Sequence, residues 1–191
     1  AFLDTFALER QRGITIFSKQ ALLSLPDLQV TLLDTPGHVD FSAEMERTLD
    51  VLDCAVLVVS AAAGVQSHTR TVWKLLRKRN IPTLLFINKM DQPGADRTEL
   101  LSQLRQELGE GFFDFAHPDL EQLALCDETL LDEFLETGTL ADSSILRAVT
   151  GCKAFPCWFG AALKLDGVEE FLHGLAQCAP AAAEGEQFGA R

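Results

Sequence analysis

The chain has 191 residues, 47% of them hydrophobic, which is enough to bury the core of one ordinary α/β domain. A formal net charge of −12 argues against a surface that coats nucleic acid, so we predict no DNA partner. Its five cysteines include no C-x-x-C pair, and they predict free, mostly buried thiols in a cytosolic protein. No apolar run is long enough to predict a membrane span.

The first structural pattern is a pair of β-rich segments. Residues 14–25 and 28–34 are rich in apolar and β-branched side chains. They are separated by Pro26 and Asp27, which are typical turn residues. We therefore predict an antiparallel hairpin here.

A crossover unit follows in the middle of the chain. Residues 54–60 and 82–88 form continuous apolar runs that end in polar residues, as parallel strands covered on both faces do. Between them, residues 66–79 carry apolar side chains at helical spacing. Strand, helix and strand in this order predict a doubly wound, mostly parallel α/β sheet.

The remaining elements complete this plan. We predict a helix over about 95–108, a last strand within 152–160 and a helix over about 167–177. The stretch 111–150 is longer than a plain connection and contains amphipathic segments, so it is predicted as a helical insertion. Residues 1–178 would form one domain, and the small, polar stretch 179–191 is predicted as a linker or tail.

The dense basic cluster of the chain consists of Lys74, Arg77, Lys78 and Arg79. It falls at the end of the helix predicted over 66–79, where positive charge complements the helix dipole. We interpret the cluster as this structural feature. His68, His117 and His173 are interpreted as ordinary surface residues.

Polar motifs follow three of the predicted strands. Asp34 ends the strand predicted over 28–34, and Asn88 to Asp91 lie at the end of the run 82–88. Gly160 to Ala162 follow the last predicted strand. In open α/β sheets, ligands bind at the carboxyl ends of the strands. The motifs are therefore predicted to belong to one site.

The first motif, Asp34 to Gly37, suits a phosphate-bound metal. An aspartate at a strand end can hold Mg²⁺ through a coordinated water, and Gly37 lets a backbone N–H approach a terminal phosphate oxygen. The alternative is an Asp-Thr-Pro-Gly turn that caps a helix starting near 42–44.

The second motif discriminates between bases. The Asp91 carboxylate can accept two hydrogen bonds from the N1–H and exocyclic amine of guanine, whereas adenine presents an acceptor there. The Lys89 stem can lie on the base plane, and Asn88 can tie neighbouring loops together. The alternative is an ordinary surface turn.

Four segments together resemble the translational GTPases in order and spacing. They read "ERQRGITI" (9–16), "DTPGHVDF" (34–41), "NKMD" (88–91) and "GAALKLDG" (160–167), like switch I, switch II, the guanine-reading loop and the last base-contacting loop. Within that group, the segments "ALERQRGITI" (7–16), "SAAAGVQSHTR" (60–70) and "NIPTLLFINKMDQPGAD" (80–96) are most similar to tetracycline-resistance ribosomal protection proteins, with elongation factor G next. The resemblance covers roughly residues 1–178.

This resemblance implies roles for residues of the phosphate side. Thr15 would bind Mg²⁺ in the GTP state, and Asp34 would hold the metal through water. Gly37 would sense the γ-phosphate, and His38 would orient the attacking water when the ribosome's RNA positions it. Ile14 would belong to an apolar gate beside His38.

Two departures from the family pattern are present. The family usually has Ser-Ala where this chain has Ala161 and Ala162; the Ala162 N–H that would meet guanine O6 is kept, but the supporting hydroxyl is lost. The motif G-x-x-x-x-G-K-[ST], which grips phosphates and Mg²⁺, does not occur in the 191 residues. In the family it precedes switch I, so we expect an amino-terminally incomplete domain without its first strand that is inactive by itself.

Three hypotheses for function remain open. The first is the GTP-binding domain of a ribosome-dependent, cytoplasmic GTPase that resembles ribosomal protection proteins, with GTP/GDP and Mg²⁺ as ligands and no membrane partner. The second is an elongation factor G-like translocase domain. The third is a non-catalytic, GTPase-like binding module that natively lacks the phosphate loop.

Overall fold

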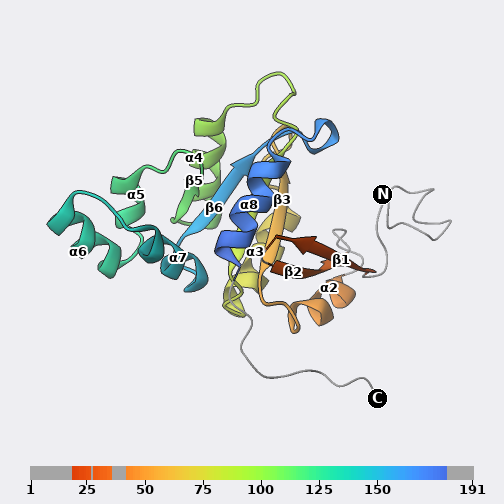
Figure 1. Cartoon of the computed structure of the whole chain (residues 1–191). Helices are drawn as coiled ribbons and strands as arrows, with labels where there is room; N and C mark the ends of the chain where they lie inside the picture. The colour runs from red at the N-terminus through yellow and green to blue at the C-terminus, as the bar shows by residue number, and fades with distance from the viewer. Residues whose placement is uncertain (1–18, 27, 36–41, 180–191) are drawn as a thin grey trace, which may run out of the picture.

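The computed structural model describes residues 19–26, 28–35 and 42–179 (Figure 1). In chain order the elements are β1 (Lys19–Leu25), β2 (Leu28–Asp34), α2 (Ser42–Leu49), β3 (Ala55–Ser60), α3 (Ser67–Lys78), β4 (Thr83–Asn88), α4 (Arg97–Leu108), β5 (Phe112–Asp114), α5 (Leu120–Ala124), α6 (Glu128–Thr137), α7 (Asp142–Thr150), β6 (Phe155–Phe159), the 3₁₀ turn η2 (Ala162–Lys164) and α8 (Val168–Cys178). The predicted helices and strands around the polar motifs are thus present, with ends shifted by a few residues.

The predicted hairpin is confirmed. β1 and β2 pair antiparallel, with Leu25 opposite Leu28 at the turn and Lys19 opposite Asp34 at the open end. In the described part of the chain these two strands form a sheet of their own, which is not hydrogen-bonded to the larger sheet. Asp34 therefore lies at the end of a strand, as predicted, on the smaller sheet.

The larger sheet is parallel and has the strand order β3-β4-β6-β5. This confirms the predicted α/β class with a parallel sheet. β4 and β6 are its central strands, and nearly all of their side chains are buried. Their continuous apolar runs are therefore explained, because a central strand packs on both faces.

Side chains of β4 divide the core into two layers. Leu85 and Ile87 pack on one face with residues of α3 and α4, such as Trp73 and Leu104. Leu84 and Phe86 pack on the other face, in the core that includes Leu175 of α8 and residues of α5 to α7. Helices therefore cover both faces of the central strands, and the carboxyl ends of these strands remain available for a site (Figure 1).

The prediction that the run 54–60 is covered on both faces was wrong. β3 lies at the edge of the four-stranded sheet and pairs with β4 alone among the described strands. Ala55 and Val59 are buried, whereas Val56 is 38% exposed and Val58 59% exposed. Successive side chains of a strand point to opposite faces, and in the described structure only one face of β3 is covered.

One strand was not predicted. β5 lies within the stretch 111–150 that was predicted as a helical insertion, and it pairs parallel with β6. Phe112 packs against Trp73, with ring centroids 5.0 Å apart, whereas Phe113 belongs to the core on the other face. At three residues, β5 is too short to show a period in the sequence. The helices α5, α6 and α7 occupy 120–150 of this stretch.

The five cysteines are free thiols, as predicted, and three of them are buried. Burial raises the pKa of the Cys178 thiol to about 12 and also raises that of Cys157. Such thiols are poor nucleophiles and metal ligands, so they serve packing. None of the helices in the described ranges is both long and apolar enough to cross a membrane.

Gly174→Ala tests the packing of α8 on the sheet. Gly174 is buried, and a Cβ built there would overlap the Trp158 indole. Alanine is favoured over glycine in a helix by about 1 kcal/mol, but overpacking costs about 1–3 kcal/mol. We expect a net loss of stability, measured as a lower free energy of unfolding in urea.

The matched control is the same substitution in a Trp158→Phe background. The smaller ring leaves space for the added methyl group, so the cost of Gly174→Ala should shrink or change sign. An equal loss in both backgrounds would show that the contact between α8 and the indole does not limit stability.

Candidate functional site

The candidate site is formed by two loops that follow β4 and β6. These strands are parallel neighbours, with Ile87 in register with Phe159, so their carboxyl ends lie at the same edge of the sheet. Gly160 continues the pairing, since its N–H donates to Ile87 O at 3.0 Å and its carbonyl accepts from Met90 N at 3.0 Å. The structure therefore brings the motifs 88–91 and 160–162 together, as predicted.

Asn88 links the two loops through its side chain. Its Oδ1 accepts a hydrogen bond from Lys89 N at 2.8 Å and another from Ala162 N at 3.0 Å. Because both partners are N–H donors, the side-chain atom that faces them must be the oxygen. The Nδ2 donor of Asn88 is not used in either of these two hydrogen bonds. The predicted tie between neighbouring loops is present.

The backbone N–H of Ala162 was predicted to meet the O6 of guanine. In this structure it donates to Asn88 Oδ1, so a ligand oxygen would have to share it or displace Asn88. Ala161 is buried, and its N–H donates to Asp166 O at 3.0 Å. The contact from Ala162 to a base therefore stays a prediction.

Lys89 has an unusual backbone conformation for a residue with a side chain. Its φ is 67°, in the left-handed region that favours glycine. The Asn88 side chain holds the Lys89 N–H, which fixes this turn locally. Left-handed residues other than glycine concentrate at functional sites, where the surrounding structure compensates the cost. The exposed Lys89 side chain is thus presented at a defined point of the loop.

Asp91, the predicted base reader, forms an ion pair with Lys164. The distance from Lys164 Nζ to Asp91 Oδ2 is 2.7 Å. The hydrogen bond from Lys164, together with its charge, lowers the pKa of the Asp91 carboxyl from its ordinary value. The carboxylate is therefore kept ionised, which is the form that accepts two hydrogen bonds. Sequence reasoning missed Lys164, and its position two residues after Ala162 was the available signal.

Two glycines allow the second loop to fold back on itself. A Cβ at Gly160 would overlap Asp166 O, so this position tolerates no side chain. Gly167 is the N-cap of α8 and has φ 71°, and a Cβ there would lie 2.6 Å from Phe159 O. The loop therefore returns close to the end of β6, and its geometry depends on both residues.

The phosphate side of the predicted site is only partly described. Ile14, Thr15, Gly37 and His38 lie outside the described residues. Asp34 is half-buried at the end of β2. Within the described ranges, no three His, Cys, Asp or Glu side chains gather as a metal site. Mg²⁺ is usually held by one or two carboxylates plus substrate phosphates, so the oxygen donors of Asp34 and Thr15 suit this ion.

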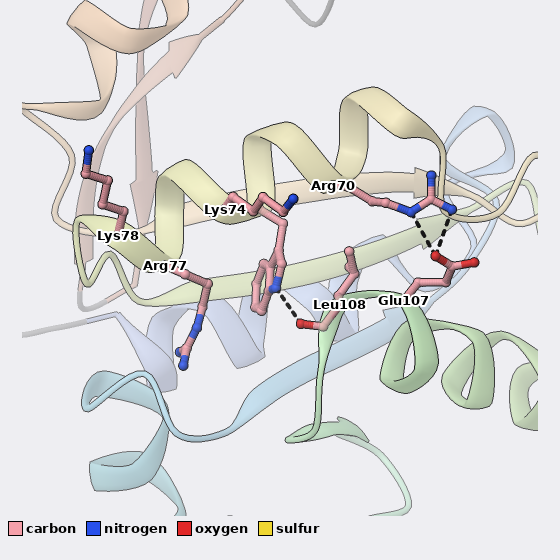
Figure 2. A pocket seen from close by; sticks show the side chains of 7 residues that line it. Arg70, Lys74, Arg77, Lys78, Glu107 and Leu108 are labelled. Atoms are coloured by element: carbon pink, nitrogen blue, oxygen red, sulfur yellow. Dashed lines mark hydrogen bonds and ion pairs between the residues drawn. The ribbon is translucent and has the colours of Figure 1, made fainter.

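The cleft between α3 and α4 is lined largely by basic residues (Figure 2). It has a volume of about 580 Å³, and its lining consists of Arg70, Trp73, Lys74, Arg77, Lys78, Glu107 and Leu108. Arg70 pairs with Glu107 at 2.7 Å, and Trp73 Nε1 donates to Leu108 O at 2.7 Å. Arg77 donates to the carbonyl of Cys152.

Both arginines of this cleft therefore form contacts within the protein. Arg77 and Lys78 lie in the last turn of α3, as the helix-dipole interpretation predicts. None of the residues that line the cleft belongs to the loops 88–91 and 160–166.

The interpretation of the histidines needs one correction. His117 and His173 are exposed, as predicted. His68 is half-buried, and neither of its ring nitrogens has a hydrogen-bond partner in the described structure. His68 lies in the first turn of α3, and its partial burial was not indicated by the sequence.

Comparison with known proteins places this geometry in a family. The chain matches the model of the elongation factor Tu GTP binding domain over residues 1–181. It is 38% identical over 206 residues to the oxytetracycline resistance protein of Streptomyces rimosus, covering 93% of this chain and 31% of that protein. It is also 38% identical over 200 residues to the tetracycline resistance protein TetM of Streptomyces lividans, with the same coverage.

Two further comparisons agree with this result. The mitochondrial elongation factor G of Drosophila grimshawi is 50% identical over 108 residues, which are 56% of this chain and 14% of that protein. A crystal structure of a protein from Thermus thermophilus has the same fold, with a TM-score of 0.78 at 22% identity over 93% of this chain and 34% of that chain. The chain thus spans about a third of the length of the resistance proteins it matches.

Substitution of Asn88 tests the link between the loops. Asn88→Ala leaves the Ala162 and Lys89 N–H groups without their acceptor, and because these bonds are only partly buried or exposed we expect a loss of about 0.5–1.5 kcal/mol in the free energy of unfolding. Asn88→Asp keeps an acceptor oxygen and should cost less. Amide hydrogen exchange at Ala162 should accelerate in the alanine variant alone. Equal exchange in both variants would contradict the link.

Proposed function

Because this chain belongs to the family of elongation factor Tu GTP-binding domains, we propose that it binds guanine nucleotides as the G domain of a ribosome-dependent translational GTPase of the ribosomal-protection type. We further propose residues 1–178 as this domain and 179–191 as a linker. The observation that carries the proposal is the pair of linked loops at the ends of β4 and β6, which present Asn88 and Asp91 at one edge of the sheet.

The chemistry of these loops supports guanine as the base. Asp91 is ionised beside Lys164 and offers two oxygens to the N1–H and 2-amino groups of guanine. Adenine would place the acceptor N1 against the same carboxylate, which leaves two acceptors facing each other. Asn88 holds the two loops together through its Oδ1, which keeps Asp91 beside the loop that carries Lys164. The loops therefore favour guanine.

The proposed phosphate side follows the family pattern residue by residue. Thr15 and Asp34 would hold Mg²⁺, which neutralises charge on the phosphate oxygens when it is bound. The Gly37 N–H would contact the γ-phosphate. His38 would orient the attacking water, and Ile14 would help to shield that water from solvent. Hydrolysis of GTP to GDP would then depend on the position of His38, which ribosomal RNA would set.

The relatives support the biological setting of the proposal. Two are named as tetracycline or oxytetracycline resistance proteins, and this chain matches 31% of each. A cytoplasmic, ribosome-bound protein is the corresponding proposal for this chain. The 50% identity to a mitochondrial elongation factor G over 108 residues supports the second candidate, a translocase domain.

Base selectivity gives the first test. The chain contains no G-x-x-x-x-G-K-[ST] motif, so we expect weaker than micromolar affinity for Mg²⁺·GTP and no significant turnover from these 191 residues. NMR titration detects such weak binding. Amide shifts at Asn88, Asp91 and Ala162 should respond to GDP and not to ADP. Asp91→Asn should favour XDP over GDP, because an amide can donate to the 2-oxo group of xanthine.

A folded chain whose loop amides respond equally to GDP and ADP would contradict the guanine assignment. Micromolar binding of Mg²⁺·GTP would overturn the expectation about the phosphate side. Circular dichroism of each variant provides the control for folding.

A domain graft separates the two candidate functions. Residues 1–178 replace the matching segment of the oxytetracycline resistance protein or of mitochondrial elongation factor G, and the rest of each host is kept. We expect ribosome-stimulated GTP hydrolysis and resistance from the first graft, and loss of both with His38→Ala. Efficient translocation by the second graft, without resistance from the first, would favour the translocase. A folded graft without hydrolysis in either host would favour the non-catalytic module.

A further inference from the structure

We propose that Lys164 is a positioning residue for the base-reading carboxylate: by holding Asp91 Oδ2 at 2.7 Å, it fixes the orientation in which both carboxylate oxygens meet guanine. The proposal rests on the proposed function, because it concerns the same base site. It assigns to Lys164 a part in the choice between bases that differ at the 2-amino group.

The backbone of Lys164 is held in place, so its side chain starts from a fixed point. Lys164 is the last residue of η2, and its N–H donates to Ala161 O at 2.8 Å. Ala161 is buried and bridges to Asp166. The next residue, Leu165, closes the turn with a left-handed φ of 60°.

The ion pair is the outermost of three links between the two loops. The inner links are the bond from Met90 N to Gly160 O and the bond from Ala162 N to Asn88 Oδ1. Both inner links fix the course of the backbone. The link to Lys164 differs, because it fixes only the side chain of Asp91, which is the group that would touch the base.

The carboxylate has enough acceptor capacity for Lys164 and guanine together. Its two oxygens offer about four lone-pair sites, and one ammonium hydrogen bond uses one of them. Oδ1 and a second site on Oδ2 remain for the N1–H and 2-amino groups. Rotation of the carboxylate out of the base plane would lose one of these bonds, and the contact with Lys164 opposes that rotation.

The pair is accessible to a ligand. The Asp91 side chain is 35% exposed and that of Lys164 is 64% exposed. A base can therefore reach the carboxylate without opening the core. At this exposure an ion pair contributes modestly, so the effect to be expected is a change of a few-fold in selectivity.

The pH at which Asp91 becomes protonated gives a second test of the role of Lys164, and this test needs no ligand. A protonated carboxyl carries a donor of its own and cannot accept from both guanine N–H groups in this geometry. Lys164 lowers the pKa of Asp91, so the ionised form persists to lower pH than it would without the lysine. Removal of the ammonium should therefore raise the pH at which Asp91 becomes protonated.

The test compares Lys164→Met with Lys164→Arg and with a control, Lys74→Met. Lys164→Met keeps an apolar stem and removes the charge, and Lys164→Arg restores a donor. Lys74 lies on the exposed side of α3 and lines the separate basic cleft, so its substitution makes the same change in net charge away from the loops. Each chain is titrated with guanosine and with inosine, which lacks the 2-amino group, and binding is followed by NMR.

We expect the guanosine-to-inosine affinity ratio to fall about two- to fivefold in Lys164→Met. The ratio should be largely kept in Lys164→Arg and unchanged in Lys74→Met. In the absence of ligand, carbon-13 NMR should show the Asp91 carboxyl titrating at higher pH in Lys164→Met alone.

The outcomes separate this proposal from the proposed function. An unchanged ratio in Lys164→Met, when the unaltered chain prefers guanosine, overturns the role of Lys164 and leaves guanine binding intact. A raised ratio also overturns it, because the lysine would then compete with the base. If the unaltered, folded chain shows no preference for guanosine, the proposed function fails and the role of Lys164 fails with it.

Discussion

The parallel pairing of β4 with β6 is the constraint on which the candidate site depends. Gly160 extends this pairing beyond the strands, since its N–H bonds to Ile87 O and its carbonyl bonds to Met90 N. The other contacts between the two loops depend on this alignment of the strand ends. A one-residue slip of one strand would turn its buried side chains to the opposite face and disrupt their packing, so the core helps to hold this register.

The two loops of the candidate site combine this fixed strand pairing with a strained backbone position at Lys89. Lys89 is held at positive φ by the Asn88 side chain, which also binds the other loop. One side chain therefore fixes an unfavourable backbone turn and the spacing of two loops at once. Such an arrangement is expected where a polar constellation must keep its shape without a ligand. The ion pair of Asp91 with Lys164 is exposed and therefore constrains the site less strongly.

The sequence predicted the elements with strong patterns and missed those that depend on tertiary contacts. The continuous apolar runs of β4 and β6 and the helical spacing in α3 were sufficient to place the loop that carries Asn88. β5 was missed because three residues show no period, and its strand conformation depends on pairing with β6. Val58 is exposed because only one face of β3 is covered in the described structure, which an apolar run does not reveal.

The contacts of the candidate site residues distinguish the proposed base-binding loops from the proposed phosphate side. The proposed base-binding part is held together by contacts between two neighbouring loops, and the partners named for Asn88 and Asp91 come from those loops. Its geometry therefore follows from the pairing of β4 with β6. Asp34, by contrast, lies on a sheet that has no hydrogen bonds to the larger one in the described structure. Selectivity for the base can thus be a property of these loops even where the affinity for a nucleotide is low, because affinity depends mainly on contacts to the phosphates and their metal ion.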